Sequence, residues 1–321
     1  MANATISNLG VADAAALTNW TADNALFEEQ FAGEVLTAFE ENVVFADKHL
    51  MRTITSGKSA NFPATWKATA RYHTAGTPIV GSNQIEHNQR TIKIDALLIA
   101  DVFIYDLEEA KNHYDVRSIY SNELGVALAK EMDTRIGRVL VLAARASATV
   151  ASGYGGGSVI TSLAKTDGEV LAGAIFDANQ VLDEKDVPEG ERYAAVAPAQ
   201  YYLLAQTTKL LNKDWGGSGV YADGEIFKVA GTSLVKSNNM PSTNVAAATT
   251  GEQNTYTGDF TNTASVVWRK EAAGTVKLMD LAMEMSGPDF HIMYQGDMMV
   301  GKYSVGHGIL RPECAVEIKT A

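Results

Sequence analysis

The sequence contains a single cysteine, Cys314, among its 321 residues. One cysteine excludes an intramolecular disulfide and a metal site built from several thiolates, and it suits a reducing compartment. Long apolar runs are also missing: no segment holds eighteen uninterrupted apolar residues, and residues 1–20 have neither a basic start nor a continuous apolar stretch. We therefore expect neither a membrane-spanning helix nor a secretory signal.

Basic residues are scarce relative to acidic ones. Lys and Arg total 26 and Asp and Glu total 38, so the net charge is 26 − 38 = −12, spread without a long run of either sign. A surface of that sign repels phosphate, which argues against a general nucleic-acid-binding protein. With 46% hydrophobic and 20% charged residues, the composition is that of an ordinary soluble protein with one large core or two modest ones.

The common catalytic and phosphate-binding motifs are absent too. SGKS at 56–59 ends like a phosphate-binding loop, but the earlier glycine of that motif is missing: Thr53 stands four residues before Gly57 and Arg52 five residues before it. GYGGGS at 153–158 follows a predicted helix, whereas a dinucleotide-binding loop follows a strand. No G-x-S-x-G, H-E-x-x-H or C-x-x-C pattern occurs, and the six histidines are scattered. We predict no catalytic residue, no cofactor and no metal, with a triad or zinc site assembled in space as the weaker alternative.

Residues 51–95 form the most unusual segment. Both ends alternate as strands do, at 52–55 and 90–94, while glycines and a proline within 76–83 mark a turn. The pattern predicts one long hairpin with arms of roughly 20 residues, which at about 3.3 Å per residue reach on the order of 65 Å. A two-stranded ribbon alone in water is marginal. We expect a neighbouring subunit to cover it, with a fold back onto its own domain as the alternative.

Several side chains of this loop are predicted to lie in a subunit interface. Apolar and aromatic side chains along an exposed ribbon are a liability unless assembly buries them. The predicted interface residues are Lys58, Phe62, Trp66, Arg71, Tyr72 and Ile79.

A long helix is predicted from residue 106 to about residue 146, and it opens within YDLEEAKNHYDVRS at 105–118. Asp106 can cap it with Glu109 three residues later, and apolar residues follow at spacings of three and four. Glu109 and His113 share a helical face, as a metal pair or an acid/base pair would, but a solvated or interfacial face explains them more simply. The residues predicted to serve capping and subunit contacts are Asp106, Glu109, His113, Asp115 and Arg117.

Shorter elements are predicted elsewhere. Residues 1–25 indicate a mobile arm, and a short helix with one aromatic face follows within 27–39. A second α+β unit follows the long helix, with a strand at 192–198, a helix at 199–211, a hairpin at 224–237 turning at Gly231, a surface loop at 238–262, and strands at 264–270, 274–285 and 289–306.

Five blocks of sequence carry a family resemblance. They are GEVLTAF (33–39), SGKSANFP (56–63), IDALLIADVFIYDLEEAKNHYDVRS (94–118), GTVKLMDLAME (274–284) and KYSVGHGILRPE (302–313). In this order and spacing, the chain resembles the major capsid proteins of T-seven-like short-tailed (podovirus) phages, and of their marine relatives, over most of its length. Blocks of this length are far more specific than a short catalytic motif.

The resemblance implies an α+β fold of the Hong Kong 97 capsid type. In that fold an N-terminal arm leads into an extended β-hairpin loop, a peripheral domain with a long spine helix, and an axial domain. The implied boundaries are 1–50 for the arm, 51–95 for the loop, 96–190 for the peripheral domain with the spine helix at about 106–146, 191–264 for the axial domain, and 265–321 for C-terminal strands that return to the peripheral domain.

The resemblance also implies a function. Copies of the chain would assemble as hexamers and pentamers into an icosahedral virion shell, with a triangulation number of about seven, around double-stranded DNA that they do not bind specifically. A scaffolding protein, a portal protein and a decoration protein are the implied partners, and assembly would take place in the host cytoplasm. The alternatives are an encapsulin-like compartment with the same fold and, more weakly, a soluble enzyme.

Overall fold

The computed structural model describes residues 35, 37–39, 42–65, 68, 70–81, 87–107, 116–147, 155–207 and 228–320. Within these ranges, no helix is long and apolar enough to cross a membrane. The chain forms two compact units: unit 1 is Met1–Val43, Leu97–Met132 and Met279–Ser304, and unit 2 is Val44–Ala96, Asp133–Leu278 and Val305–Ala321.

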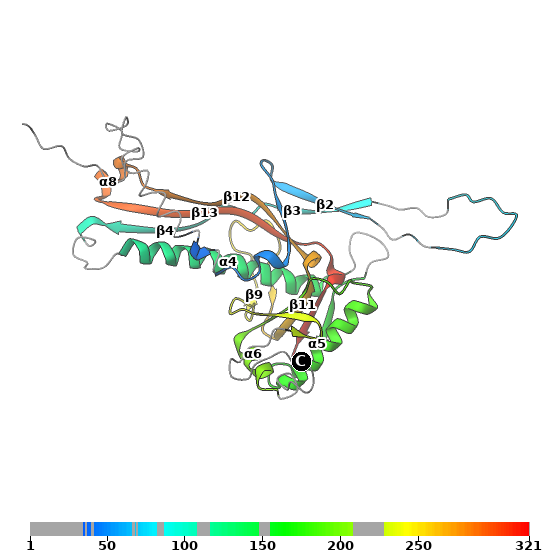
Figure 1. The fold of residues 1–321 in the computed structure, drawn as a ribbon. Helices are drawn as coiled ribbons and strands as arrows, with labels where there is room; N and C mark the ends of the chain where they lie inside the picture. Colours follow the sequence, from blue (N-terminus) through cyan, green and yellow to red (C-terminus); the bar gives the residue numbers. More distant parts are fainter. Residues whose placement is uncertain are drawn as a thin grey trace, which may run out of the picture. The chain divides into compact units, whose positions relative to one another are not determined.

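Three long elements contribute residues to both units. They are helix α4 (Val116–Arg145) and strands β12 (Ala273–Met285) and β13 (Gly296–Ile309) (Figure 1). The division into units cuts across the boundaries that the resemblance implies, which concern roles within an assembly. Those boundaries stay a prediction.

Unit 1 is built on strand β4 (Leu98–Tyr105), which pairs antiparallel with β13 from Leu98 opposite Tyr303 to Tyr105 opposite Gly296. Successive side chains of a strand point to opposite faces. One face of this pair packs on Leu124 of α4, in an apolar core that also contains Val35, Ala100, Val102, Ile104, Leu281, Met283, Met285 and Met299. On the other face, Ile99, Phe103 and Tyr105 are exposed.

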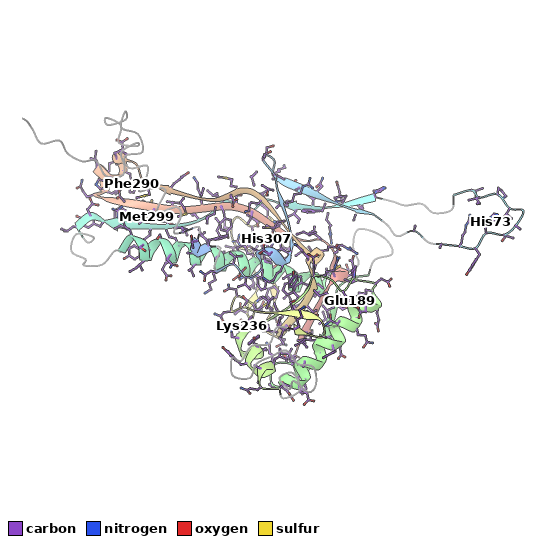
Figure 2. All side chains as sticks on the ribbon, in the orientation of Figure 1. His73, Glu189, Lys236, Phe290, Met299 and His307 are labelled. Carbon is purple, nitrogen blue, oxygen red and sulfur yellow. The ribbon has the colours of Figure 1, made fainter. Side chains whose placement is uncertain are left out.

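Helix α8 (Pro288–Tyr294) lies between β12 and β13 in the sequence. The predicted strand at 289–306 is therefore wrong over its first six residues. Pro288 occupies the first turn, where a missing backbone N–H costs nothing, and Gln295 ends the helix in the left-handed region at φ 52°. Its ring residue Phe290, labelled in Figure 2, stacks on Tyr294 at a centroid distance of 4.5 Å, so local contacts override the strand propensity of the sequence.

Unit 2 contains a six-stranded sheet in the order β5-β14-β11-β6-β8-β7. β11 lies at its centre and pairs antiparallel with β14 and β6, whereas the β6–β8 and β14–β5 pairs are parallel. A central strand is buried on both faces and is nearly all apolar, as TASVVWR is, with Trp268 fully buried. The strands are β5 (Ser158–Thr161), β6 (Arg192–Val196), β7 (Lys228–Val229), β8 (Thr232–Lys236), β11 (Thr263–Arg269) and β14 (Ala315–Lys319).

Two helices belong to this unit, α5 (Gly168–Glu184) and α6 (Pro198–Ala205). The Asp167 side chain caps α5 by accepting a hydrogen bond of 2.8 Å from the backbone N–H of Glu169. At Gly168 a Cβ atom would lie 2.1 Å from the carbonyl oxygen of Leu203, so only glycine lets the two helices approach this closely. The sequence prediction missed α5.

The remaining elements are short. β9 (Asn244–Val245) and β10 (Gly258–Asp259) form an antiparallel pair within the predicted loop 238–262. Single 3₁₀ turns occur at Ala46–Lys48, Lys270–Ala272 and Pro312–Cys314.

Most predicted strands and helices of the second half are confirmed. β6, β11 and β12 occupy predicted strands, and β7 and β8 form the predicted hairpin, with Gly231 at φ 76°. α6 covers the start of the predicted helix at 199–211, whose end lies outside the described residues. α4 lies within the predicted helix 106–146, and residues 108–115 of that helix also lie outside the described residues.

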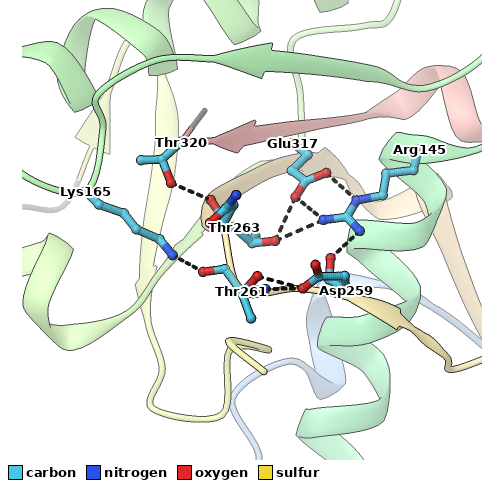
Figure 3. Close-up of polar contacts among 8 residues, drawn as sticks. Arg145, Lys165, Asp259, Thr261, Thr263, Glu317 and Thr320 are labelled. Carbon is cyan, nitrogen blue, oxygen red and sulfur yellow. Dashed lines mark hydrogen bonds and ion pairs between the residues drawn. The ribbon is translucent and has the colours of Figure 1, made fainter. Parts of the chain in front are cut away.

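An ion pair between a partly exposed arginine and a buried glutamate ties the end of α4 to the sheet of unit 2 (Figure 3). Arg145 donates two hydrogen bonds of 2.6 Å to the two carboxylate oxygens of Glu317 on β14. The Glu317 side chain is 0% exposed. Thr263 of β11 donates to the same carboxylate at 2.7 Å, and Arg145 also donates to the carbonyl oxygen of Asp259 at 2.6 Å. The hydrogen bond to Glu317 raises the pKa of Arg145. A buried carboxylate thus has all its charge compensated by a bidentate partner.

Replacing Arg145 by Met should lower the free energy of unfolding of the unassembled subunit by about 3 kcal/mol, because the buried Glu317 would keep its charge without a cationic partner, with only the Thr263 hydroxyl left as a donor. Adding Glu317→Gln should recover part of the loss. Urea unfolding followed by tryptophan fluorescence measures both. Lys228→Met, at an exposed position, is the control and should change stability by about 0.5 kcal/mol or less. Equal effects of Arg145→Met and Lys228→Met would contradict the expectation.

Candidate assembly site

The distal part of the loop, residues 70–81, is exposed. Tyr72 is 102% exposed, Ile79 78% and Val80 75%, and no residue within 70–81 belongs to a strand. The predicted turn is present: the backbone N–H of Thr77 donates to the carbonyl oxygen of Thr74 at 3.2 Å, and Gly76 between them has φ 84°. Figure 2 shows the His73 side chain in this part of the loop. We call residues 70–81 the distal loop.

The proximal part of the loop is a short antiparallel ribbon of β2 (Ser59–Thr65) and β3 (His87–Lys93). An antiparallel strand pair is therefore present within the predicted hairpin 51–95, but the pairing begins at Ser59, later than predicted. The earlier strand β1 (Leu50–Thr53) pairs parallel with β12 instead, in the four-stranded sheet ordered β1-β12-β13-β4. Residues 52 and 53 lie in a strand as predicted, but both are exposed, so their burial does not alternate, and the strand belongs to a different sheet from the ribbon.

The ribbon packs on the core of its own unit. Ala60 of β2 and Ile92 of β3 are buried with Val276 and Leu310, and the half-buried Phe62 packs against this cluster. The guanidinium carbon of Arg52 also lies 5.9 Å from the centre of the Phe62 ring. We expected a neighbouring subunit to bury Phe62, but its own subunit already covers part of the ring.

The other predicted loop residues divide between exposed and undescribed. Lys58 is exposed, while its carbonyl oxygen accepts a hydrogen bond of 2.9 Å from Ile94. Arg71, Tyr72 and Ile79 are exposed in the distal loop, and Trp66 lies outside the described residues. Their role as interface residues stays a prediction.

Two buried histidines meet at one hydroxyl below the loop. Nδ1 of His49 lies 2.7 Å from the carbonyl oxygen of Phe45, which can only accept, so Nδ1 carries the proton. Nε2 of His49 must then accept from the hydroxyl of Thr275 at 2.7 Å. That hydroxyl has one proton, so Nδ1 of His307, also 2.7 Å away, donates to its oxygen. Burial favours the neutral form of both imidazoles, and in that form each carries its proton on Nδ1.

His307 on β13 is linked through Tyr256 to Asp95, at the end of the loop that follows β3. The backbone N–H of His307, labelled in Figure 2, donates to the hydroxyl oxygen of Tyr256 at 3.0 Å. The Tyr256 hydroxyl donates to the carboxylate of Asp95 at 2.5 Å. Asp95 also accepts from the backbone N–H of Gln253 at 2.7 Å and from the side-chain amide of Asn254 at 3.1 Å. We call this hydrogen-bonded series the root chain; its residues are His49, Thr275, His307, Tyr256 and Asp95.

Two further contacts hold the returning end. The Asn254 side chain donates to the carbonyl oxygen of Lys93 at 2.7 Å and accepts from the N–H of the same residue at 3.3 Å, as a neighbouring strand would. The N–H of Ala96 donates to the carbonyl oxygen of Gly251 at 2.9 Å.

Burial dominates the electrostatics of the root chain. It lowers the pKa of His49 to about 4 and lowers the pKa of His307 well below its usual range, because a buried imidazolium would lose its hydration. Burial also raises the pKa of Tyr256, followed by the charge of Asp95. The root chain therefore contains one formal charge, on Asp95, whose carboxylate accepts hydrogen bonds from three donors.

The predicted contacts of the long helix are only partly within the described residues. Asp106 lies 3.2 Å from Nε2 of His291, and Arg117 donates to Asp297 at 3.0 Å. Asp297 in turn lies 2.9 Å from Nδ1 of His291, so Asp106, His291, Asp297 and Arg117 form one row of polar contacts in unit 1. Three other predicted residues, Glu109, His113 and Asp115, lie outside the described residues.

The root chain was not predicted from the sequence, in which the histidines are scattered. A polar residue within the apolar run YSVGHGIL is nonetheless a usable signal for a buried partner. Among the described residues, no group of three or more His, Cys, Asp and Glu side chains is placed to hold a metal.

The described residues contain a buried polar network and a loop whose distal part exposes apolar side chains. Both features suit a structural protein that forms interfaces. The fold is that of phage capsid proteins. The chain is similar to the chain in a structure described as the capsid structure of the cyanophage P-SCSP1u, with a TM-score of 0.81, 45% identity, and coverage of 100% of this chain and 99% of that one. The mature capsid of bacteriophage PhiM1 shares the fold, with a TM-score of 0.70, 20% identity, and coverage of 87% of each chain.

A family model described as Gp10A-like major capsid protein matches residues 61–319, and the chain belongs to this family. The major capsid protein of Escherichia phage T7 is 33% identical over 317 residues, covering 91% of this chain and 90% of the relative. That of Enterobacteria phage T3 is 34% identical over 319 residues, with the same coverage. The predicted family, the capsid fold and the structural, non-enzymatic role are thereby confirmed, and the protein is a component of the phage virion.

The root chain makes subunit stability depend on pH. His49 takes up a proton below about pH 6.5 in the unfolded chain, but only below about pH 4 in the folded subunit, because burial lowers its pKa. The free energy of unfolding should therefore fall as the pH drops through this window, by on the order of 3 kcal/mol from His49 alone. His49→Gln should flatten the slope measured by urea unfolding at several pH values, whereas His73→Gln in the exposed distal loop should not. Identical slopes for all three proteins would refute this.

Proposed function

We propose that this major capsid protein assembles as hexamers and pentamers into an icosahedral shell around double-stranded DNA, and that residues 51–95 tie each subunit to its neighbour. The observation that carries the proposal is the distal loop, where Tyr72, Ile79 and Val80 are all more than 70% exposed. Exposed apolar side chains on a projecting segment point to a surface that buries them. Self-assembly supplies that surface in many copies, and many modest contacts add up to a stable shell.

The remaining segments take the roles implied by the fold. Residues 1–50 serve as the arm, 96–190 with 265–321 as the peripheral domain, and 191–264 as the axial domain. The start of the long helix makes subunit contacts through His113 and four charged residues, Asp106, Glu109, Asp115 and Arg117.

A scaffolding protein, a portal protein and a decoration protein are the partners we propose, with assembly in the host cytoplasm. Support comes from the kinship with capsid proteins of tailed phages T7 and T3. The encapsulin-like compartment is not favoured, because the family and the similar curated proteins are all phage capsid proteins.

Replacing the distal loop by a short Gly-Ser linker should abolish assembly while the subunit stays folded. The distal loop contributes no strand to either unit, whereas β2 and β3 keep their contacts with the core. Far-UV circular dichroism and sedimentation of the variant, with scaffolding protein present, measure folding and assembly separately.

The matched control for this deletion is Ile92→Ala in the ribbon core, at a side chain that is 1% exposed. It should instead destabilise the subunit by about 2–5 kcal/mol. Normal shells from the loop-replaced protein would exclude the loop as the intersubunit tie. Global unfolding of that variant would show that the distal loop belongs to the subunit core.

The unassembled subunit should bind double-stranded DNA only weakly at about 150 mM salt, since its net charge of −12 repels phosphate. Fluorescence anisotropy with a labelled duplex tests this. Submicromolar affinity at that salt concentration would contradict the view that the genome is enclosed without being bound.

A further inference from the structure

We propose that the root chain is the positioning device of the loop: it fixes the backbone at both roots of residues 51–95 and thereby sets the direction in which the distal loop reaches a second copy of this chain. The inference rests on the proposed role of the loop in assembly. It adds a buried site on which that role depends.

Both roots of the loop end on the root chain. His49 directly precedes β1, where the chain leaves for the loop, and Asp95 follows β3, where the chain returns. The two residues are 2% and 4% exposed and are joined through Thr275 of β12 and His307 of β13, which are 0% and 1% exposed. Two segments 46 residues apart in the sequence are thus held on one pair of strands by four hydrogen bonds in series.

The series has no redundancy at its centre. The hydroxyl of Thr275 donates to one histidine and accepts from the other, so its loss leaves Nε2 of His49 without a donor and Nδ1 of His307 without an acceptor. Among the residues that the structure describes, Nε2 of His307 has no hydrogen-bond partner, so Nδ1 is the ring nitrogen that anchors this side chain. Buried polar atoms left unpaired are costly, and the roots would relax to repair them.

Protonation cannot replace the lost bonds. The charged groups that act on His49 are Asp47, Lys48 and Lys270, and Arg135 acts on His307 together with His49 itself. Burial is the main reason that neither ring takes up a proton; Lys48 and Lys270 also oppose a proton on His49, against the favourable charge of Asp47, and Arg135 opposes one on His307. The root chain therefore contains both rings in their neutral form.

The start of the loop is also held by backbone pairing between strands. β1 pairs with β12 over four residues, from Leu50 opposite Gly274 to Thr53 opposite Lys277. Thr275 lies inside this pairing, opposite Met51, so its side chain controls the same stretch of strand that begins the loop. A displaced root would change the exit angle of a segment that then continues for tens of residues, and a small rotation there moves the distal loop by a large distance.

The decisive variant is Thr275→Val, which removes the hydroxyl and keeps the shape of the side chain. Its control is Thr232→Val in unit 2, because Thr232 is also 0% exposed and its hydroxyl donates to the side chain of Asn179 at 2.9 Å, away from the loop. Thr275→Ser restores the hydroxyl and should rescue the wild-type behaviour. Tyr256→Phe breaks the series at a second point, should Thr275→Val fail to fold.

Hydrogen–deuterium exchange on the unassembled full chain measures the roots directly. We expect Thr275→Val and Tyr256→Phe to speed exchange at residues 50–54 and 92–96 by about tenfold, with helix α5 unchanged. Thr232→Val should leave the roots unchanged. In ¹⁵N spectra of the histidine rings, Thr275→Val should remove the Nδ1-protonated signature of His307, whose Nδ1 loses its acceptor, while His49 keeps its own through the carbonyl oxygen of Phe45. A loss of general stability would not separate the two rings in this way.

Assembly is then measured by sedimentation with scaffolding protein, beside the variant that lacks the distal loop. Faster root exchange with at least tenfold fewer shells, rescued by Thr275→Ser, supports the proposal. Unchanged root exchange in Thr275→Val, or loose roots with normal shell yield, overturns it. The loop-replaced variant separates the two ideas: if it also forms normal shells, the proposed role of the loop fails, whereas if it fails to assemble, only the root chain is rejected.

Discussion

A two-stranded ribbon cannot stabilise itself in water, and the arrangement of residues 51–95 follows from that constraint. Near its base the ribbon is held by its own subunit, because Ile92 and Ala60 enter a core with Val276 and Leu310. Farther out, the distal loop has no strand partner and exposes Tyr72 and Ile79. The same segment is thus an internal element at one end and an interface element at the other.

Buried polar groups connect the parts of unit 2 that apolar packing alone would leave free to shift. Arg145 and Glu317 join the end of α4 to β14. Asp133 accepts hydrogen bonds of 2.9 and 3.2 Å from the backbone N–H groups of Val44 and Phe45, just before the root chain begins. Each network is satisfied almost completely, and such networks specify one arrangement where apolar contacts tolerate several. For a subunit that must repeat the same contacts many times, a unique geometry matters more than added stability.

Sequence patterns predicted the elements whose signals are local. Gly76 and Gly231 mark turns because both adopt positive φ, and the apolar run TASVVWR marks a strand buried on two faces. Helix α5 was missed although Leu171, Ile175, Ala178 and Leu182 keep helical spacing behind the cap Asp167, so its signal was available. The first residues of the predicted strand 289–306 form α8 because Pro288 starts a helical turn that strand propensity does not anticipate.

The candidate site was predictable only in part, for a physical reason. The exposed loop announces itself by its length and its apolar residues, whereas the root chain joins His49 to a hydroxyl 226 residues away, and no spacing rule connects them. Likewise Phe62 was expected to need a neighbour, since a sequence does not reveal that its own β12 and Leu310 lie beneath it. The family resemblance supplied the role of the protein, and the three-dimensional contacts supplied the means by which its loop is held.

The central claim is that the distal loop is covered by a second copy of this chain. An electron cryomicroscopy map of assembled shells at side-chain resolution tests it most directly. The account predicts that residues 70–81 lie against the neighbouring subunit, with the side chains of Tyr72 and Ile79 buried there and the hydroxyl of Thr275 between the two histidines. A map in which residues 70–81 project into solvent, or fold back onto their own subunit, would contradict it.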